Sequence, residues 1–145
     1  MNTQYTSTEI NQKRQLLQNY DPAQEALTVL EQHQGQLDEA FDQLWSQTHE
    51  SNIATFDKGK KRSFWQVTLE VLRTEVCGDE GFRSKINEFN KNPGSAPLLT
   101  GLIVYLVEVT TIAISPAIAT IIVLYIIKVG LNIFCEYTQP QKEEN

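Results

Sequence analysis

The residues that could carry out chemistry are few and widely spaced in this chain of 145 residues. It has two histidines, His33 and His49, and two cysteines, Cys77 and Cys135. They form no CxxC or HExxH pattern, and the chain has no glycine-rich phosphate loop or GxSxG elbow. Because Cys77 follows an apolar helical stripe and Cys135 closes an apolar segment, inert thiols are a better prediction than a cysteine–histidine nucleophile pair. We predict no catalytic residue, no cofactor and no metal.

The charge of the chain changes along its length. Residues 1–55 carry 2 basic and 8 acidic residues, residues 56–95 carry 8 and 6, and residues 96–145 carry 2 and 4, which together make the 12 basic and 18 acidic residues of the chain. Nucleic-acid binding needs a larger basic surface, so no nucleic-acid partner is predicted. The first residues lack the apolar segment of a secretory signal, and no cleavable signal is predicted.

Residues 1–47 have the start and stop signals of three short helices. Thr6 and Glu9 have the spacing of a capping box, and Asp21 is predicted to cap a second helix with Pro22 at its first position. Gly35 is predicted to end that helix. A third helix over residues 37–45, or a little beyond, carries one apolar face made of Leu37, Ala40, Phe41, Leu44 and Trp45.

The segment ALTVLEQHQGQLDEAFDQLW resembles the second and third helices of the UBA-like superfamily, which includes ubiquitin-associated domains and the N-terminal module of elongation factor Ts. The positions that match in register are Ala26, Leu27, Leu30, Gly35, Leu37, Asp38, Ala40, Phe41 and Leu44. The resemblance covers residues 6–47 and implies a three-helix, non-catalytic protein-binding module. The agreement of the caps, the apolar stripes and the Gly35 turn predicts that this module folds on its own. The resemblance places the protein-binding residues at Asn19, Tyr20, Asp21, Leu44 and Trp45.

The predicted binding loop departs from the ubiquitin-binding version of this module. That version has Met-Gly followed by an aromatic residue, whereas this chain has Gln18-Asn19-Tyr20. We therefore expect a protein partner other than ubiquitin. The alternative role of Tyr20 and Trp45 is to pack the small core.

Residues 48–62 lack sustained periodicity and are predicted to be a linker that ends in a basic run. Residues 63–92 then predict two amphipathic helices, separated near Gly78. These helices could belong to a small bundle, or they could lie in a membrane interface with their cationic side chains toward anionic headgroups. The second interpretation assigns the membrane interface to Lys58, Lys60, Lys61, Arg62, Trp65, Arg83 and Lys85.

Residues 97–135 contain two apolar segments, 97–114 and 117–134, separated by Ser115-Pro116. Each would measure about 27 Å as a helix, close to the roughly 30 Å hydrocarbon core of a bilayer. The pattern predicts a transmembrane helical hairpin, followed by a polar tail over residues 136–145. The basic residues before the first segment predict that both termini are cytoplasmic. The alternatives are a hairpin buried in a soluble helical domain and a re-entrant or single span.

Each apolar segment contains one charged residue, Glu108 in the first and Lys128 in the second. A charge at the centre of a bilayer is costly, so both intramembrane polar residues are predicted to face a helix or water. Whether they pair with each other is left open by their positions.

These observations predict an all-α protein made of a UBA-like bundle, amphipathic helices and a transmembrane hairpin. Its predicted function is that of a non-enzymatic, membrane-anchored adaptor whose partners are a protein and the lipid bilayer. If the hairpins of several copies assemble, the protein would also form a homo-oligomer. One alternative is a membrane-perturbing or pore-forming effector regulated through the N-terminal module. The other is a soluble all-α interaction protein with a buried hairpin.

Overall fold

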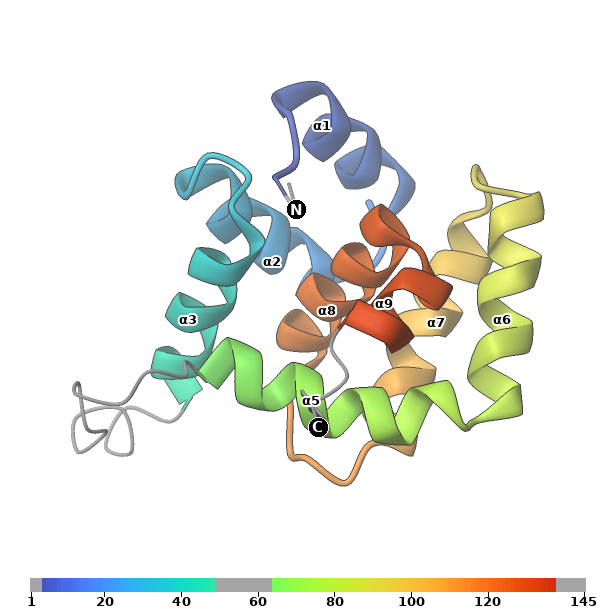
Figure 1. Ribbon diagram of the computed structural model, residues 1–145. Helices are drawn as coiled ribbons and strands as arrows, with labels where there is room; N and C mark the ends of the chain where they lie inside the picture. The colour runs from blue at the N-terminus through green and yellow to red at the C-terminus, as the bar shows by residue number, and fades with distance from the viewer. Residues whose placement is uncertain (1–3, 49–63, 138–145) are drawn as a thin grey trace.

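A computed structural model describes residues 4–48 and 64–137, which form eight helices and no β-strand (Figure 1). The prediction of an all-α fold is therefore confirmed for these residues. Extended pairing among them is limited to one isolated bridge between Gln4 and Gln36. The helices are α1 (Ser7–Leu16), α2 (Asp21–Gln32), α3 (Leu37–Thr48), α5 (Phe64–Cys77), α6 (Glu80–Lys91), α7 (Ala96–Val109), α8 (Pro116–Val129) and α9 (Leu131–Tyr137).

Helix α8 lies at the centre of the molecule. Every side chain from Ala117 to Ile126 is buried, whereas a helix at a protein surface buries only one face. Helices α2, α3, α7 and α9 pack against it, and Figure 1 shows it enclosed by its neighbours. A helix that is apolar on all sides either spans a membrane or forms the core of a protein. In this structure α8 forms the core.

The prediction of a transmembrane hairpin is wrong. Helix α7 ends at Val109, and the second apolar segment is divided at Gly130, whose φ of 91° separates α8 from α9. The two apolar helices have 14 residues each, which is about 21 Å of helix and too short for the hydrocarbon core. Among the residues that the structure describes, no helix is both long and apolar enough to cross a bilayer. This finding contradicts the predicted localisation in a membrane with two spans and both termini cytoplasmic.

The turn between α7 and α8 is held by a carboxylate of α5. Thr110 donates its hydroxyl to Glu75 Oε1 at 2.6 Å, and the backbone N–H of Thr111 donates to the same carboxylate at 3.2 Å. The Thr111 hydroxyl also donates to Glu75. Ser115 then caps α8 by accepting from the backbone N–H of Ile118 at 3.1 Å. The predicted break at Ser115-Pro116 is therefore confirmed, and the turn lies against α5.

The start and stop signals of the N-terminal helices are mostly where the sequence predicts them. Thr6 and Glu9 form a capping box. Helix α2 ends at Gln32, and the first left-handed residue after it is Gln34, with a φ of 58°, followed by Gly35 with a φ of 84°. The left-handed end predicted at Gly35 therefore begins one residue earlier. The second cap is shifted by one residue. Tyr20 is the N-cap of α2, so Asp21 is its first residue and Pro22 its second. Pro22 is still tolerated, because backbone N–H groups in the first turn have no partner within the helix.

The N-terminal helices share an apolar core with the C-terminal ones. Helices α2 and α3 both pack on α8, and the buried apolar side chains from Tyr5 to Phe134 form one cluster. The Tyr5 hydroxyl donates to the carbonyl of Leu124 at 2.7 Å. The predicted domain boundaries remain predictions, since the linker over residues 48–62 lies, apart from Thr48, outside the described residues.

Candidate interaction surface

The predicted protein-binding residues differ in how accessible they are. Asn19 and Asp21 are exposed at the turn between α1 and α2, and Tyr20 is half-buried against the core. Leu44 is buried, whereas Trp45 near the end of α3 is half-buried. Leu44 therefore acts as a core residue, and Trp45 is the accessible member of that pair.

Trp45 belongs to a series of six aromatic rings, here called the aromatic chain. In order, the rings are Phe64, Trp45, Phe41, Trp65, Tyr125 and Phe134, and successive centroids are 5.3, 5.6, 5.2, 5.1 and 6.0 Å apart. The chain crosses the core from the start of α5 to α9. Its last four members are buried, while Trp45 and Phe64 are half-buried.

The position of Trp65 corrects its predicted role at a membrane interface. Its side chain is only 9% exposed, and its ring lies between those of Phe41 and Tyr125. Placing this ring in a headgroup region would require it to leave the core. Trp65 therefore connects α5 to α3 and α8.

Helix α5 is apolar on a second, exposed side. Val67 and Val71 are 39% and 38% exposed. They follow Phe64 by three and seven positions and therefore lie on the same face of the helix. The opposite face of α5 packs into the core through Trp65, Leu69, Leu72 and Val76. The exposed stripe thus begins at the aromatic pair of Phe64 and Trp45.

The exposed side of α3 is acidic. Asp38, Glu39 and Asp42 are exposed, and Glu39 lies 3.4 Å from His33 Nδ1. Although the residue as a whole is exposed, neighbouring atoms desolvate the Asp42 carboxyl group. This desolvation, together with the charges of Asp38 and Glu39, raises the pKa of Asp42 to about 6. Asp38, Asp42 and Trp45 are spaced by four and three residues, so the acidic side leads to the aromatic pair.

These two features meet where the end of α3 lies beside the start of α5 (Figure 1). We call the combined feature the α3–α5 surface. It consists of Asp38, Glu39, Asp42, Trp45, Phe64, Val67 and Val71.

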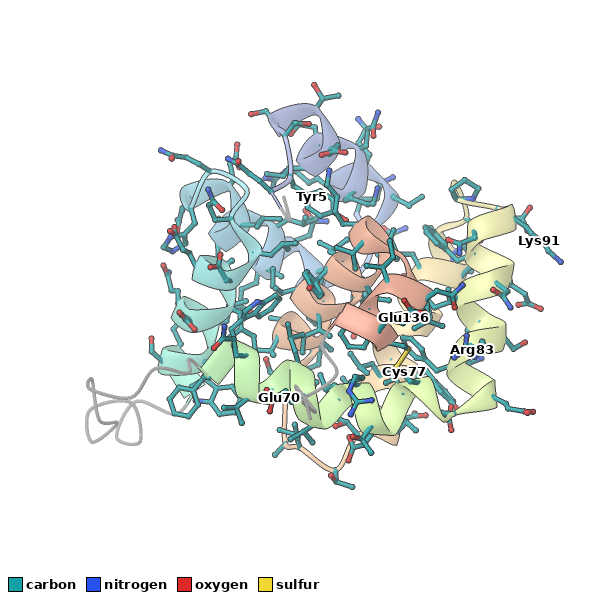
Figure 2. All side chains as sticks on the ribbon, viewed as in Figure 1. Tyr5, Glu70, Cys77, Arg83, Lys91 and Glu136 are labelled. Carbon is teal, nitrogen blue, oxygen red and sulfur yellow. A yellow bond between two sulfur atoms is a disulfide. The ribbon has the colours of Figure 1, made fainter. Side chains whose placement is uncertain are left out.

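The cationic residues predicted to face lipid on α6 make contacts within the protein. Arg83 donates to the carbonyl of Cys77 at 3.1 Å, and Lys85 Nζ lies 5.1 Å from the centroid of the Tyr105 ring. Figure 2 shows Arg83 and Cys77 near each other, where α5 meets α6. The other predicted interface residues, Lys58, Lys60, Lys61 and Arg62, lie outside the described residues.

The two residues predicted to be intramembrane do not lie in a membrane hairpin. Glu108 is exposed, and Lys128 forms an ion pair with Glu9 at 2.9 Å. Lys128 Nζ also lies 4.9 Å from the centroid of the Tyr5 ring. Lys128 therefore pairs with Glu9 and not with Glu108. The sequence pattern contains no signal that connects Glu9 with Lys128.

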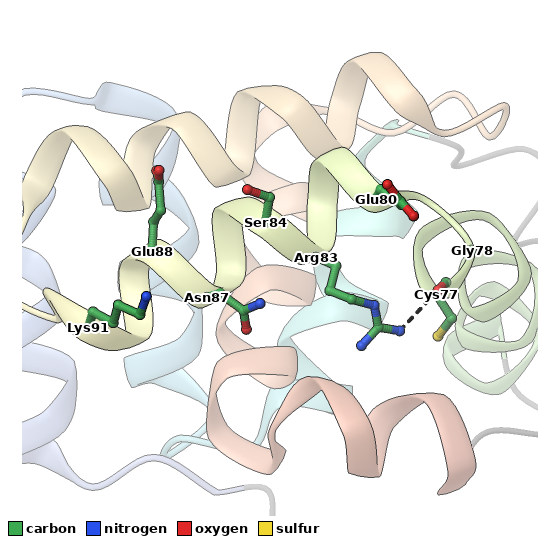
Figure 3. A pocket seen from close by; sticks show the side chains of 8 residues that line it. All are labelled: Cys77, Gly78, Glu80, Arg83, Ser84, Asn87, Glu88 and Lys91. Carbon is green, nitrogen blue, oxygen red and sulfur yellow. Dashed lines mark hydrogen bonds between the residues drawn. The ribbon is translucent and has the colours of Figure 1, made fainter.

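The two cysteines form a disulfide, with 5.8 Å between their Cα atoms, so the prediction of inert thiols is wrong. The spacing of the two cysteines in the sequence does not predict this bond, because the bond depends on the packing of α5 against α9. Beside Cys77 lies an open groove of about 630 Å³, lined by polar side chains of α6 (Figure 3). Within residues 4–48 and 64–137, no cluster of side chains suited to a metal ion occurs.

Comparisons with known proteins found no matching family model and no match among the curated proteins or the solved structures. The resemblance of residues 6–47 to the UBA-like superfamily therefore stays a prediction. The α3–α5 surface has to be judged on its own chemistry.

Proposed function

We propose that this protein is a non-enzymatic protein-interaction module that binds its partner through the α3–α5 surface. The observation that supports this function is the exposed stripe of Val67 and Val71, continuous with the half-buried rings of Trp45 and Phe64. Protein interfaces have an apolar, aromatic centre and a polar rim, and tryptophan is enriched among the residues that dominate binding energy.

The partner that fits this surface is a basic amphipathic segment. Its apolar side chains would cover the valine stripe, and its lysines or arginines would lie against the carboxylates of α3. The pKa of Asp42 is raised first by desolvation of its carboxyl group and then by the charges of Asp38 and Glu39. A cation placed beside this group would favour its ionised form, which supports the assignment. Electrostatic complementarity of this kind gives specificity and fast association.

Trp45 belongs both to this surface and to the contact site that the UBA-like resemblance implies. The remaining accessible residues of that site are Asn19, Tyr20 and Asp21, which lie on the turn before α2. We include this turn as a secondary contact. Its contribution is separable, because Asn19 and Asp21 are exposed and can be changed without affecting the core.

A selection experiment tests the proposed surface. The immobilised full chain would be offered a library of random helical peptides, and we expect enrichment of sequences with apolar residues at helical spacing and flanking lysine or arginine. Val71→Asp should lower the affinity of the protein for the selected peptides about 10- to 30-fold, because loss of an interface anchor costs about 1.4 to 2 kcal/mol of binding free energy. Val104→Asp is a matched control, because Val104 is also 38% exposed but lies on α7.

The pH dependence of binding provides a second test. A cationic partner favours the ionised form of Asp42, whose pKa is about 6 in the free protein. Affinity should therefore rise as the pH increases through 6, and Asp42→Asn should flatten this dependence. Equal binding to Val71→Asp and to the unchanged protein, or enrichment of acidic peptides, would exclude the α3–α5 surface.

A further inference from the structure

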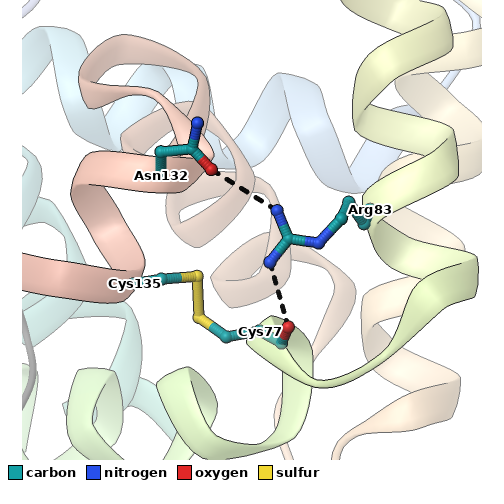
Figure 4. Close-up of a disulfide and its surroundings, with 4 residues drawn as sticks. All are labelled: Cys77, Arg83, Asn132 and Cys135. Carbon is teal, nitrogen blue, oxygen red and sulfur yellow. Dashed lines mark hydrogen bonds between the residues drawn. A yellow bond between two sulfur atoms is a disulfide. The ribbon is translucent and has the colours of Figure 1, made fainter.

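The disulfide joins the last residue of α5 to the short helix α9 (Figure 4). Cys77 and Cys135 are both half-buried rather than enclosed in the core. Disulfide exchange requires that a thiolate reach one of the two sulfur atoms. The partial exposure of both cysteines is compatible with that requirement.

The groove beside the disulfide is an approach route for a small molecule. It has a volume of about 630 Å³, and Cys77 is one of its lining residues. Most of the others come from the outer face of α6, including Arg83, Ser84, Asn87 and Lys91 (Figure 3). Cys135 is absent from the lining, so the groove leads to Cys77 rather than to its partner.

Arg83 is a cation that contacts both segments joined by the disulfide. Its guanidinium donates to the carbonyl of Cys77 at 3.1 Å and to Asn132 Oδ1 of α9 at 3.4 Å. Figure 4 shows the guanidinium beside the sulfur–sulfur bond, between the end of α5 and α9. An arginine in this position attracts an incoming thiolate and stabilises thiolates formed when the bond is cleaved. Glu80 and Glu88 also line the groove, but the contact with the Cys77 carbonyl places Arg83 next to the disulfide.

We propose that Cys77–Cys135 is an exchangeable disulfide, cleaved by a small thiol such as glutathione that enters this groove. The thiolate sulfur forms a bond with Cys77 Sγ while the Cys77–Cys135 bond breaks, and Cys135 leaves as a thiolate that takes up a proton. A second thiol then attacks the small-molecule sulfur of the mixed disulfide and releases the Cys77 thiolate. Two small thiols are oxidised to one disulfide, and the protein disulfide is reduced to two thiols.

Cleavage releases α9 from the rest of the molecule. This helix has 7 residues, which is too short to be stable alone. It follows Gly130, and its buried apolar contacts are those of Leu131 and Phe134. The Phe134 ring packs on Tyr125, so release of α9 uncovers one end of the aromatic chain. The disulfide therefore holds α9 against the core, and its cleavage by a thiol releases this helix.

The test uses the full, oxidised chain and reduced glutathione at neutral pH without denaturant. Mass spectrometry after alkylation should detect a transient adduct on Cys77, followed by two free thiols. Hydrogen exchange should then speed up in residues 131–137 while α2 and α3 keep their protection. Cleavage only after denaturation, an adduct on Cys135, or unchanged protection of α9 in the reduced protein would each overturn the proposal.

Variants of α6 separate the role of Arg83 from general access to the bond. Arg83→Gln should slow cleavage by glutathione about 3- to 10-fold, the effect of half to one unit in a thiolate pKa. Arg83→Lys should restore most of the rate, because it keeps the positive charge. Lys85→Gln should leave the rate unchanged, since Lys85 lies over Tyr105. Equal rates for Arg83→Gln and the unchanged protein would remove Arg83 from the proposed exchange site.

Discussion

At the scale of single residues, Gly35 has a role that no other residue type can fill. Its φ is 84°, and a Cβ atom at this position would overlap the carbonyl oxygen of Tyr5. The backbone N–H of Tyr5 donates to the Gly35 carbonyl at 2.9 Å, so the two segments cannot separate without losing that bond. Gly35→Ala should therefore lower the free energy of unfolding by at least about 1 to 2 kcal/mol, the usual cost of a left-handed conformation. Urea denaturation would measure this change.

Gly101 provides the opposite case within the same chain. It lies inside α7, and nothing is within 4 Å of the position that its Cβ would occupy. Gly101→Ala should raise the free energy of unfolding by about 0.5 to 1 kcal/mol, because glycine is a poor helix former. A stabilising Gly35→Ala variant in the same assay would contradict the described turn.

The ion pair between Lys128 and Glu9 predicts a pH-dependent contribution to stability. A hydrogen bond from the backbone N–H of Thr6, and then the ammonium of Lys128, lower the pKa of Glu9. A carboxyl group with a lowered pKa in the folded state stabilises the fold above its unfolded pKa, and this stability is lost as the pH falls through the folded pKa. Lys128→Met should cost about 1 kcal/mol or less at neutral pH, since the pair is partly exposed.

The difference in unfolding free energy between Lys128→Met and the unchanged protein should shrink in acid. It should not vanish, because the contact of Lys128 with the Tyr5 ring does not titrate with Glu9. Denaturation curves at neutral and acidic pH would show this. A difference that stays constant with pH would mean that Glu9 is not the stabilising partner.

At the scale of elements, α8 should respond to mutation unlike any surface helix. Ile121, Ile122, Val123 and Leu124 are consecutive and fully buried. Changing Ile121, Ile122 or Leu124 to alanine should cost about 2 to 5 kcal/mol, and Val123 somewhat less. In α6 the costly positions should instead be Phe82, Ile86 and Phe89, with tolerant positions between them. An alanine scan of both helices, followed by urea denaturation, would compare the two patterns. If alanine substitutions in α8 were tolerated at every third or fourth position, one face of this helix would be exposed to solvent.

The boundaries of elements were predictable wherever the signal acts within a few residues. The capping box of Thr6 and Glu9 and the break at Ser115-Pro116 are local signals, and the structure confirms both. The stop predicted at Gly35 is also local, and it begins one residue earlier, at Gln34. The surroundings of α8 were not predictable in this way. A wholly apolar helix has the same composition in a bilayer and in a protein core. The distinguishing contacts come from residues as distant as Tyr5, 119 positions before Leu124.

The candidate site was only partly predictable for the same reason. Trp45 was named because the UBA-like resemblance implies a contact at the end of the third helix, but its neighbours Phe64, Val67 and Val71 come from another helix. Pairing these residues requires the position of α5 against α3. The disulfide likewise depends on the approach of α5 and α9.

At the scale of the whole molecule, the shared core predicts a single unfolding transition. Trp45 and Trp65 lie in the aromatic chain that connects α3, α5, α8 and α9, so their fluorescence should change together with the helical circular dichroism signal. A fragment of residues 1–50 would expose the faces of α2 and α3 that pack on α8. We expect its thermal melt to be broad and weakly cooperative. A sharp, cooperative melt of this fragment would support the independently folding module that its caps and apolar stripes predict.

The central position of α8 has a further consequence for the order in which the chain is made. A ribosome completes α2 and α3 well before it reaches α8, and about 70 residues separate the end of α3 from the start of α8. At about 5 to 20 residues per second, this interval lasts several seconds. During that time the apolar faces of the first helices have no core to pack on, and they are open to aggregation or to chaperones. The yield of folded protein should therefore depend on the speed of translation between α3 and α8.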